Sequence, residues 1–206
     1  MRFRRNGRRY LKQFWTRRPD WTFGSETQMD EFTTHISYCT QWSRYGKHPH
    51  NVISEAEALR RHKRGELYTA VLGIENRPSC FLEFSAFRSV CVEFLDSALR
   101  TYFHYSFQEM RPNELFISAS HRPEFPNDTD EPDRATVLHF KTDGHLLIVR
   151  FKANPDGIGS KLVGQETRTV EVTRNWEPYP EFGDYKGLST IDRGAPLLCY
   201  PDRSGE

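Results

Sequence analysis

The stretch Ala135-Thr-Val-Leu-His-Phe-Lys141-Thr-Asp-Gly-His145-Leu-Leu-Ile-Val-Arg-Phe-Lys152 decides the fold, because it places two short β-forming runs around an Asp-Gly pair. β-Branched and aromatic residues favour strands. A two-residue type I′ turn needs positive φ at both positions, and Asp143-Gly144 is a preferred pair for it. The stretch therefore predicts an antiparallel β-hairpin.

Similar short runs fill most of the chain after Gly65, and turn residues separate them. Strands that follow one another without intervening helices pair antiparallel. We therefore predict a meander with strands at 67–74, 80–87, 90–95, 99–107, 115–120, 135–141, 145–152 and 167–173. The segments 121–134 and 153–164 are expected to be loops.

Two helices are predicted before the sheet. Ser25-Glu-Thr-Gln28 matches a capping box, and Gly46 is a plausible stop. Between them, four residues recur at helical spacing: Met29, Phe32, Ile36 and Cys39. A second box, Ser54-Glu-Ala-Glu57, opens a shorter helix that Gly65 ends. The expected fold class is α+β, with N-terminal helices followed by a large, mainly antiparallel meandering β-sheet in one domain, residues 25–206.

The net charge of +1 hides an uneven distribution. Residues 1–20 hold eight of the 29 basic side chains and one of the 28 acidic ones, which leaves 21 bases and 27 acids for residues 21–206. That remainder has a net charge of −6, which favours a basic protein partner over general nucleic-acid binding. The apolar runs are far shorter than the roughly 20 residues that span a bilayer. We expect a cytoplasmic protein without membrane contact.

Residues 1–24 form a basic, aromatic N-terminal arm with three interpretations. Aromatic residues interleave with its arginines, as in segments that bind nucleic acid. The arm is also Arg-rich and acid-poor like a transit peptide, but it lacks the usual serines. The third interpretation is a leader that packs its aromatic rings on the body and leaves its charges in water.

No clear motif for a cofactor, a metal or covalent catalysis is present. The four cysteines form no CxxC pair, so we expect free thiols: Cys39, Cys80, Cys91 and Cys199. His48-Pro49-His50 lacks an identifiable third metal ligand. Gly157-Ile-Gly-Ser160-Lys161 has neither the spacing nor the order of a phosphate-binding loop. We expect no cofactor and no metal.

A polar cluster on the sheet is the alternative that would make this chain an enzyme. If the meander forms, Glu83, Glu93 and His104 face the same way on successive strands. Two carboxylates and an imidazole can perform acid–base chemistry, as in a small hydrolase or transferase. The competing interpretation is the solvated face of an antiparallel sheet.

Two segments are the candidate partner-binding sites. The loop 121–134 is rich in acids that could steer a basic partner: Glu124, Asp128, Asp130, Glu131 and Asp133. The run 175–185 combines aromatic residues with prolines and could supply buried anchors: Trp176, Tyr179, Phe182 and Tyr185. We expect both segments to contribute to one recognition surface. The competing interpretations are a solubilising loop and aromatic residues that pack in the core.

The chain from Asn51 to Gly194 resembles bacterial immunity proteins that neutralise polymorphic toxins. The resemblance lies in Thr142-Asp-Gly-His145 with its flanking strands, in 170–177 and in 180–185. It covers about two-thirds of the chain, and the arm 1–20 departs from the pattern. It implies a single α+β domain without a catalytic motif, which binds a cognate toxin domain and occludes its active site. A nucleic-acid-binding module that uses the arm is a further alternative.

Overall fold

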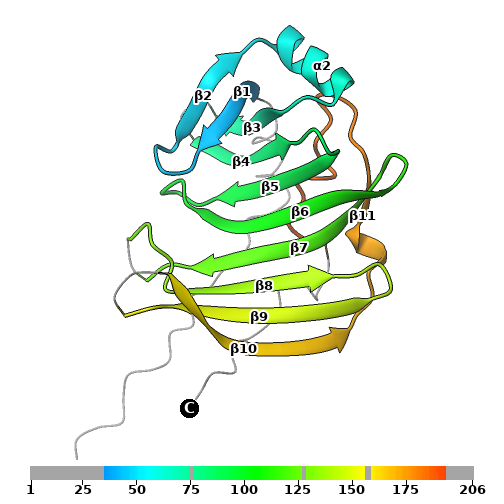
Figure 1. Cartoon of the computed structure of the whole chain (residues 1–206). Helices are drawn as coiled ribbons and strands as arrows, with labels where there is room; N and C mark the ends of the chain where they lie inside the picture. Colours follow the sequence, from blue (N-terminus) through cyan, green and yellow to red (C-terminus); the bar gives the residue numbers. More distant parts are fainter. Residues whose placement is uncertain (1–34, 75–76, 127–128, 156–158, 194–206) are drawn as a thin grey trace, which may run out of the picture.

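The computed structural model describes residues 35–74, 77–126, 129–155 and 159–193. These residues form one antiparallel sheet of eleven strands (Figure 1). The strands are β1 (Ile36–Ser43), β2 (His48–Ile53), β3 (Tyr68–Ile74), β4 (Arg77–Phe84), β5 (Ser89–Leu95), β6 (Thr101–Arg111), β7 (Glu114–Glu124), β8 (Arg134–Phe140), β9 (His145–Ala153), β10 (Ser160–Thr169) and β11 (Trp176–Pro178). Helix α2 (Glu55–Arg64) is the only α-helix in the described ranges.

The predicted meander is confirmed. From β3 to β10 every strand pairs with the next one in the chain, and the spatial order is β10-β9-β8-β7-β6-β5-β4-β3-β1-β2. Only β11 lies off this path, because it pairs with β7 beyond the end of β8. The predicted loop 153–164 is shorter than expected, because strand β10 already begins at Ser160.

The hairpin predicted around Asp143-Gly144 is β8–β9, but its turn is not type I′. Gly144 has a φ of +87°, whereas Asp143 does not have positive φ. The Gly144 amide donates to the Lys141 carbonyl at 3.0 Å, so the turn spans four residues and ends on the left-handed glycine. A Cβ at Gly144 would lie 2.7 Å from the Val170 carbonyl oxygen, which explains why glycine is needed here.

The predicted α+β fold with helices first is wrong. The start of the first predicted helix lies outside the described residues, but its described part is strand β1, and Gly46 lies in the β1–β2 turn. Residues 36–43 also show the alternation of β-forming and polar side chains that is typical of a strand. Because this segment pairs with β3, it forms a strand and not a helix. The described chain is therefore a sheet protein with one short helix.

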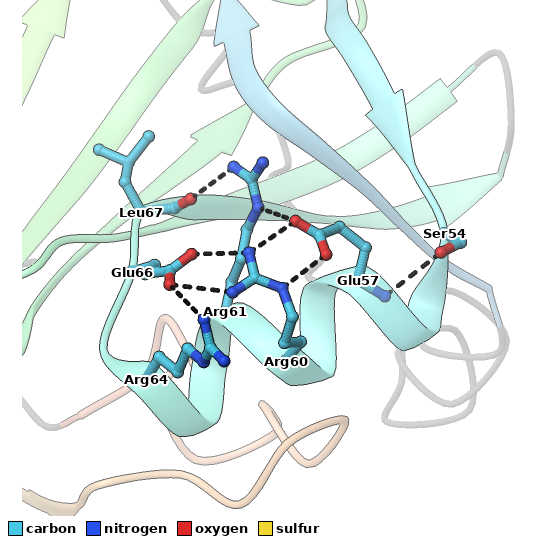
Figure 2. A network of polar contacts seen from close by, with 7 residues as sticks. All are labelled: Ser54, Glu57, Arg60, Arg61, Arg64, Glu66 and Leu67. Atoms are coloured by element: carbon cyan, nitrogen blue, oxygen red, sulfur yellow. Dashed lines mark hydrogen bonds and ion pairs between the residues drawn. The ribbon is translucent and has the colours of Figure 1, made fainter.

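The second predicted helix is confirmed as α2. Its N-cap is Ser54, whose hydroxyl accepts a hydrogen bond from the Glu57 amide at 3.2 Å. Gly65 ends the helix in the left-handed conformation, with φ +64°. Figure 2 shows that Glu57 does not complete the capping box, because its carboxylate accepts from Arg60 and Arg61 instead. These ion pairs join Arg60 and Arg61 to the acidic first turn of the helix.

One face of the sheet, here called the inner face, carries the main core. A C-terminal strap, residues 170–193, covers this face and lies behind the sheet in Figure 1. The strap runs beside β7 as β11, with the Trp176 ring 4.8 Å from the Phe116 ring. It then passes to β3 and β1, where the Phe182 ring lies 5.1 Å from that of Tyr38. It returns to β6, where the Tyr105 hydroxyl donates to the Ile191 carbonyl.

His62 joins α2 to the strap inside an aromatic cluster. Four rings surround it at centroid distances of 5.6–5.9 Å: Tyr68, Phe84, Tyr179 and Phe182. Its Nδ1 lies 2.8 Å from the Tyr68 hydroxyl, which in turn lies 3.2 Å from the Tyr185 hydroxyl. Burial lowers the pKa of His62 below its usual value. The fold therefore favours the neutral imidazole.

We expect His62 to make the protein less stable in mild acid. Its pKa is lower in the folded chain than in the unfolded one, so the unfolded state binds more protons as pH falls below about 6.5. The loss is at most about 1.4 kcal/mol per pH unit and ends once the pH passes below the folded pKa. Urea unfolding of His62→Gln, between about pH 7 and 5, should show a weaker pH dependence than the parent. The exposed His145→Gln variant is the control. An unchanged pH dependence in His62→Gln would contradict this assignment.

No helix in the described ranges is both long and apolar enough to cross a membrane.

Candidate functional site

The outer face of the sheet, opposite the strap, carries two rows of mostly polar residues across β4–β7. In the first row Phe81, Glu93, His104 and His121 are successive cross-strand partners. In the second row the partners are Glu83, Cys91, Ser106 and Ala119. Directly paired side chains lie about 5 Å apart at Cβ, so the strand pairing brings these groups together. The predicted proximity of Glu83, Glu93 and His104 is confirmed.

Arg44 reaches this cluster from the β1–β2 turn. Its Nε lies 2.9 and 3.1 Å from the two carboxylate oxygens of Glu93, and one of its terminal nitrogens lies 2.5 Å from Glu83 Oε2. Thr101 donates its hydroxyl to Glu93 at 2.7 Å. The Glu93 side chain is only 4% exposed, so these partners compensate a buried negative charge. Hydrogen bonds to the carboxylates raise the pKa of Arg44, although its burial acts in the opposite direction.

The fold favours the neutral form of the two histidines of the first row. Burial lowers the pKa of His104 and of His121, while the Glu93 carboxylate raises both. Their rings meet edge to face with centroids 6.3 Å apart. His104 Nε2 lies 2.7 Å from the Ser106 hydroxyl, so a proton could pass between these two groups.

Arg44 binds both carboxylates of the cluster. Arg44 and Thr101 already occupy both oxygens of Glu93, and no hydrogen bond among those described joins His104 to either carboxylate. A Ser–His pair becomes a strong nucleophile when a third group orients the imidazole. In the described residues the carboxylates of Glu83 and Glu93 are paired with Arg44, and the His104 imidazole contacts Ser106.

The β1–β2 hairpin covers this cluster. Trp42 is 3% exposed and stacks on Phe81 with ring centroids 5.5 Å apart. Beyond it, Lys47 Nζ lies 2.7 Å from Asp130 Oδ1 in the β7–β8 connection. Figure 1 shows this turn on the same side of the molecule as the β5–β6 and β7–β8 connections. The hairpin thus bridges the outer face from β1 to the acidic loop.

The acidic segment is held by two further contacts. Arg100 donates to the Thr129 carbonyl at 2.8 Å, and its guanidinium lies 4.7 Å from the centre of the Phe125 ring. Glu124 is the last residue of β7. Asp130 and Glu131 are exposed, Asp133 is half-buried, and Asp128 lies outside the described residues. The loop is therefore shorter than predicted and is attached to both neighbouring turns.

The predicted aromatic anchors all pack against the core. Tyr185 is 2% exposed. Trp176, Tyr179 and Phe182 are partly buried against the same cluster. Arg88 also covers the Tyr179 ring, with its guanidinium 4.1 Å from the ring centre. The core-packing interpretation accounts for these contacts.

The acidic and aromatic segments are not brought together. β11 pairs with the first residues of β7, whereas the acidic loop follows its last residue. β7 is 11 residues long, so its ends lie roughly 35 Å apart. The strap also lies on the inner face, while Lys47 and Arg44 cover the outer one. The two predicted segments therefore do not lie side by side in the described structure.

The described residues contain no group of three or more His, Cys, Asp or Glu that could hold a metal ion. His48 and His50 have ring centroids 5.0 Å apart. Cys39, Cys80 and Cys91 are free thiols, and burial raises the pKa of each. The basic arm 1–24 and Cys199 lie outside the described residues.

Three residues of the cluster were not predicted from the sequence: Arg44, Thr101 and His121. Arg44 falls within the first predicted helix, so its contacts with Glu83 and Glu93 across the sheet could not be predicted. His121 falls in the segment 121–134 that we predicted to be a loop, and Thr101 pairs with Leu95 across an irregularity in the β5–β6 ladder. Comparisons of the chain with models of protein families, with curated proteins and with solved structures found no match.

Proposed function

We propose that this chain is a cytoplasmic immunity protein that binds a cognate bacterial toxin domain and occludes its active site, without enzymatic activity of its own. The observation that carries the proposal is a surface that we call the hairpin–loop surface: Tyr45, Lys47, Asp130, Glu131 and Asp133. Tyr45 is fully exposed at the tip of the hairpin. The Lys47–Asp130 ion pair joins that tip to the acidic loop.

An exposed tyrosine beside a charged loop has the chemistry of a binding surface. Tyrosine gives a large amphipathic contact area, and it is enriched among residues that dominate binding energy. The carboxylates of Asp130 and Glu131 suit a basic partner and steer its approach. The net charge of −6 over residues 21–206 adds to the same attraction.

Preorganisation strengthens the proposal. Lys47 and Arg100 attach the loop to two separate turns, and Arg44 and Trp42 hold the hairpin on the sheet. A surface that is already ordered loses less conformational entropy when a partner binds. Tight binding by a small area is therefore physically reasonable here.

Co-expression with the toxin tests the proposal directly. The C-terminal domain encoded by the neighbouring gene is expressed in a bacterial host with and without this chain. We expect the domain to stop growth when alone, and the chain to restore growth through a complex of about one-to-one stoichiometry. A neighbour without toxicity, or toxicity that the chain does not relieve, would count against the proposal.

Within that complex we expect Tyr45→Ala to speed dissociation by roughly 30-fold, the equivalent of about 2 kcal/mol for a central contact. Phe87→Ala is the matched control, because Phe87 is 91% exposed on the β4–β5 turn, away from the hairpin–loop surface. Surface plasmon resonance measures both rates. Equal dissociation rates for Tyr45→Ala, Phe87→Ala and the parent would place the partner elsewhere.

A further inference from the structure

The outer part of the β1–β2 hairpin is attached to the sheet by side chains. β1 pairs with β3 only from Ile36 to Cys39, whereas it pairs with β2 from Tyr38 to Ser43. Beyond Cys39 the described backbone pairing with β3 therefore ends, and Trp42, Arg44 and Lys47 provide the contacts to the rest of the sheet. A movement of the outer hairpin away from the sheet would therefore turn about Cys39 and Thr40, where the pairing with β3 ends.

The charged groups under the hairpin carry a net charge of −1. With both histidines neutral, Arg44 faces the carboxylates of Glu83 and Glu93, so one positive charge opposes two negative ones. The groups that face His104 are Glu93 on β5, His121 on β7 and the Arg44 guanidinium from the turn. Glu93 is also the charge that acts on His121, and the β8 partner of His121 is the uncharged Val137.

Protonation of the two histidines reverses this balance. Two added positive charges give three cations against two carboxylates in the same desolvated cluster. The His104 imidazolium is the direct cross-strand partner of Glu93 and competes with Arg44 for its carboxylate. Like charges at this distance repel strongly where water is scarce. Arg44 is the cation that can leave, because its side chain is 48% exposed and sits on the hinged segment.

We propose that the β1–β2 hairpin is an acid-released cover, in which protonation of His104 and His121 frees Arg44 from Glu93 and lifts the segment beyond Thr40 from the outer face. The released state uncovers Phe81 and the His104–Ser106 pair. This device is a two-state element whose equilibrium a half-buried histidine pair biases. It does not depend on the proposed toxin partner.

Fluorine NMR of the full chain labelled with 5-fluorotryptophan tests the release. The Trp42 and Trp176 signals are assigned from Trp42→Phe and Trp176→Phe. Exposure is measured as the shift difference between H2O and D2O. Below about pH 6.5 we expect the Trp42 signal to change to an exposed one, while Trp176 under the strap stays unchanged. Trp42 and Trp176 changing together would indicate global unfolding and would overturn the proposal.

Two variants identify the groups responsible. His104→Gln/His121→Gln should keep Trp42 buried at the pH where the parent releases it, whereas the control His48→Gln/His50→Gln, changed at exposed hairpin positions, should behave like the parent. If His104→Gln/His121→Gln does not fold, Arg44→Met provides the decisive measurement. Arg44→Met should expose Trp42 at neutral pH with Trp176 unchanged. Trp42 that remains buried in Arg44→Met, or a release that persists in His104→Gln/His121→Gln, would overturn the proposal.

Discussion

Tyr185→Ala should lower the free energy of unfolding by about 3–5 kcal/mol, the cost of removing a large aromatic ring from a packed core. Tyr185 is 2% exposed, and its ring lies 5.4 Å from that of Phe84. Its hydroxyl lies 3.2 Å from that of Tyr68, so the variant also leaves a buried hydroxyl with fewer partners. Urea unfolding, followed by circular dichroism, measures the change.

The matched control is Tyr185→Phe, which keeps the ring and removes only the hydroxyl. We expect it to cost about 1 kcal/mol, because one buried hydrogen bond is lost and the packing remains. The pair of variants separates the two interpretations of the strap. If Tyr185→Ala were as stable as the parent, the strap would not be part of the core, and its aromatic residues would again be candidates for binding.

The sheet could be predicted because its signals are local. From β3 to β10 each strand is a short β-forming run, and each connection carries turn residues. A strict meander also makes neighbours in sequence neighbours in space. For that reason the amino-acid sequence alone predicts that Glu93 and His104, on consecutive strands, lie close together.

The first hairpin could not be predicted, because two periods compete within it. Ile36 and Cys39 fit a helical spacing, while Tyr38, Thr40 and Trp42 fit a strand. The decision comes from pairing with β3, whose residues lie roughly 30 positions later in the chain. Local propensity contains no information about that contact. The error also hid Arg44, since a residue in a helix would not reach the outer face.

For the strap, too, the amino-acid sequence alone could not predict the packing. Its aromatic residues and prolines suit either an exposed docking segment or a packed cover. The folded sheet distinguishes the two possibilities, because the rings of Tyr38, Tyr68 and Phe84 on its inner face pack against the strap. The acidic loop could be located as a loop from its composition. Its attachment to Lys47 could not, because that contact joins residues 83 positions apart.

Arg193→Met should lower the free energy of unfolding by roughly 2–4 kcal/mol, because it removes one partner of a buried ion pair. Arg193 ends the described part of the strap, and its side chain is 4% exposed. Its guanidinium donates to Glu177 at 2.5 Å and to the Gly187 carbonyl. It also lies 5.2 Å from the centre of the Phe107 ring, so it joins three parts of the strap and core.

A double-mutant cycle with Glu177→Gln isolates the ion pair from the packing. In Arg193→Met the Glu177 carboxylate loses its cation in a site that is only 23% exposed. Neutralising it as well should restore about 1–3 kcal/mol relative to the sum of the two single changes. Partial solvent access to Glu177 keeps this coupling energy below that of a fully buried pair. Strictly additive losses would mean that Arg193 acts through its packing over Tyr105 and Phe107, and that its charge contributes nothing to closing the strap.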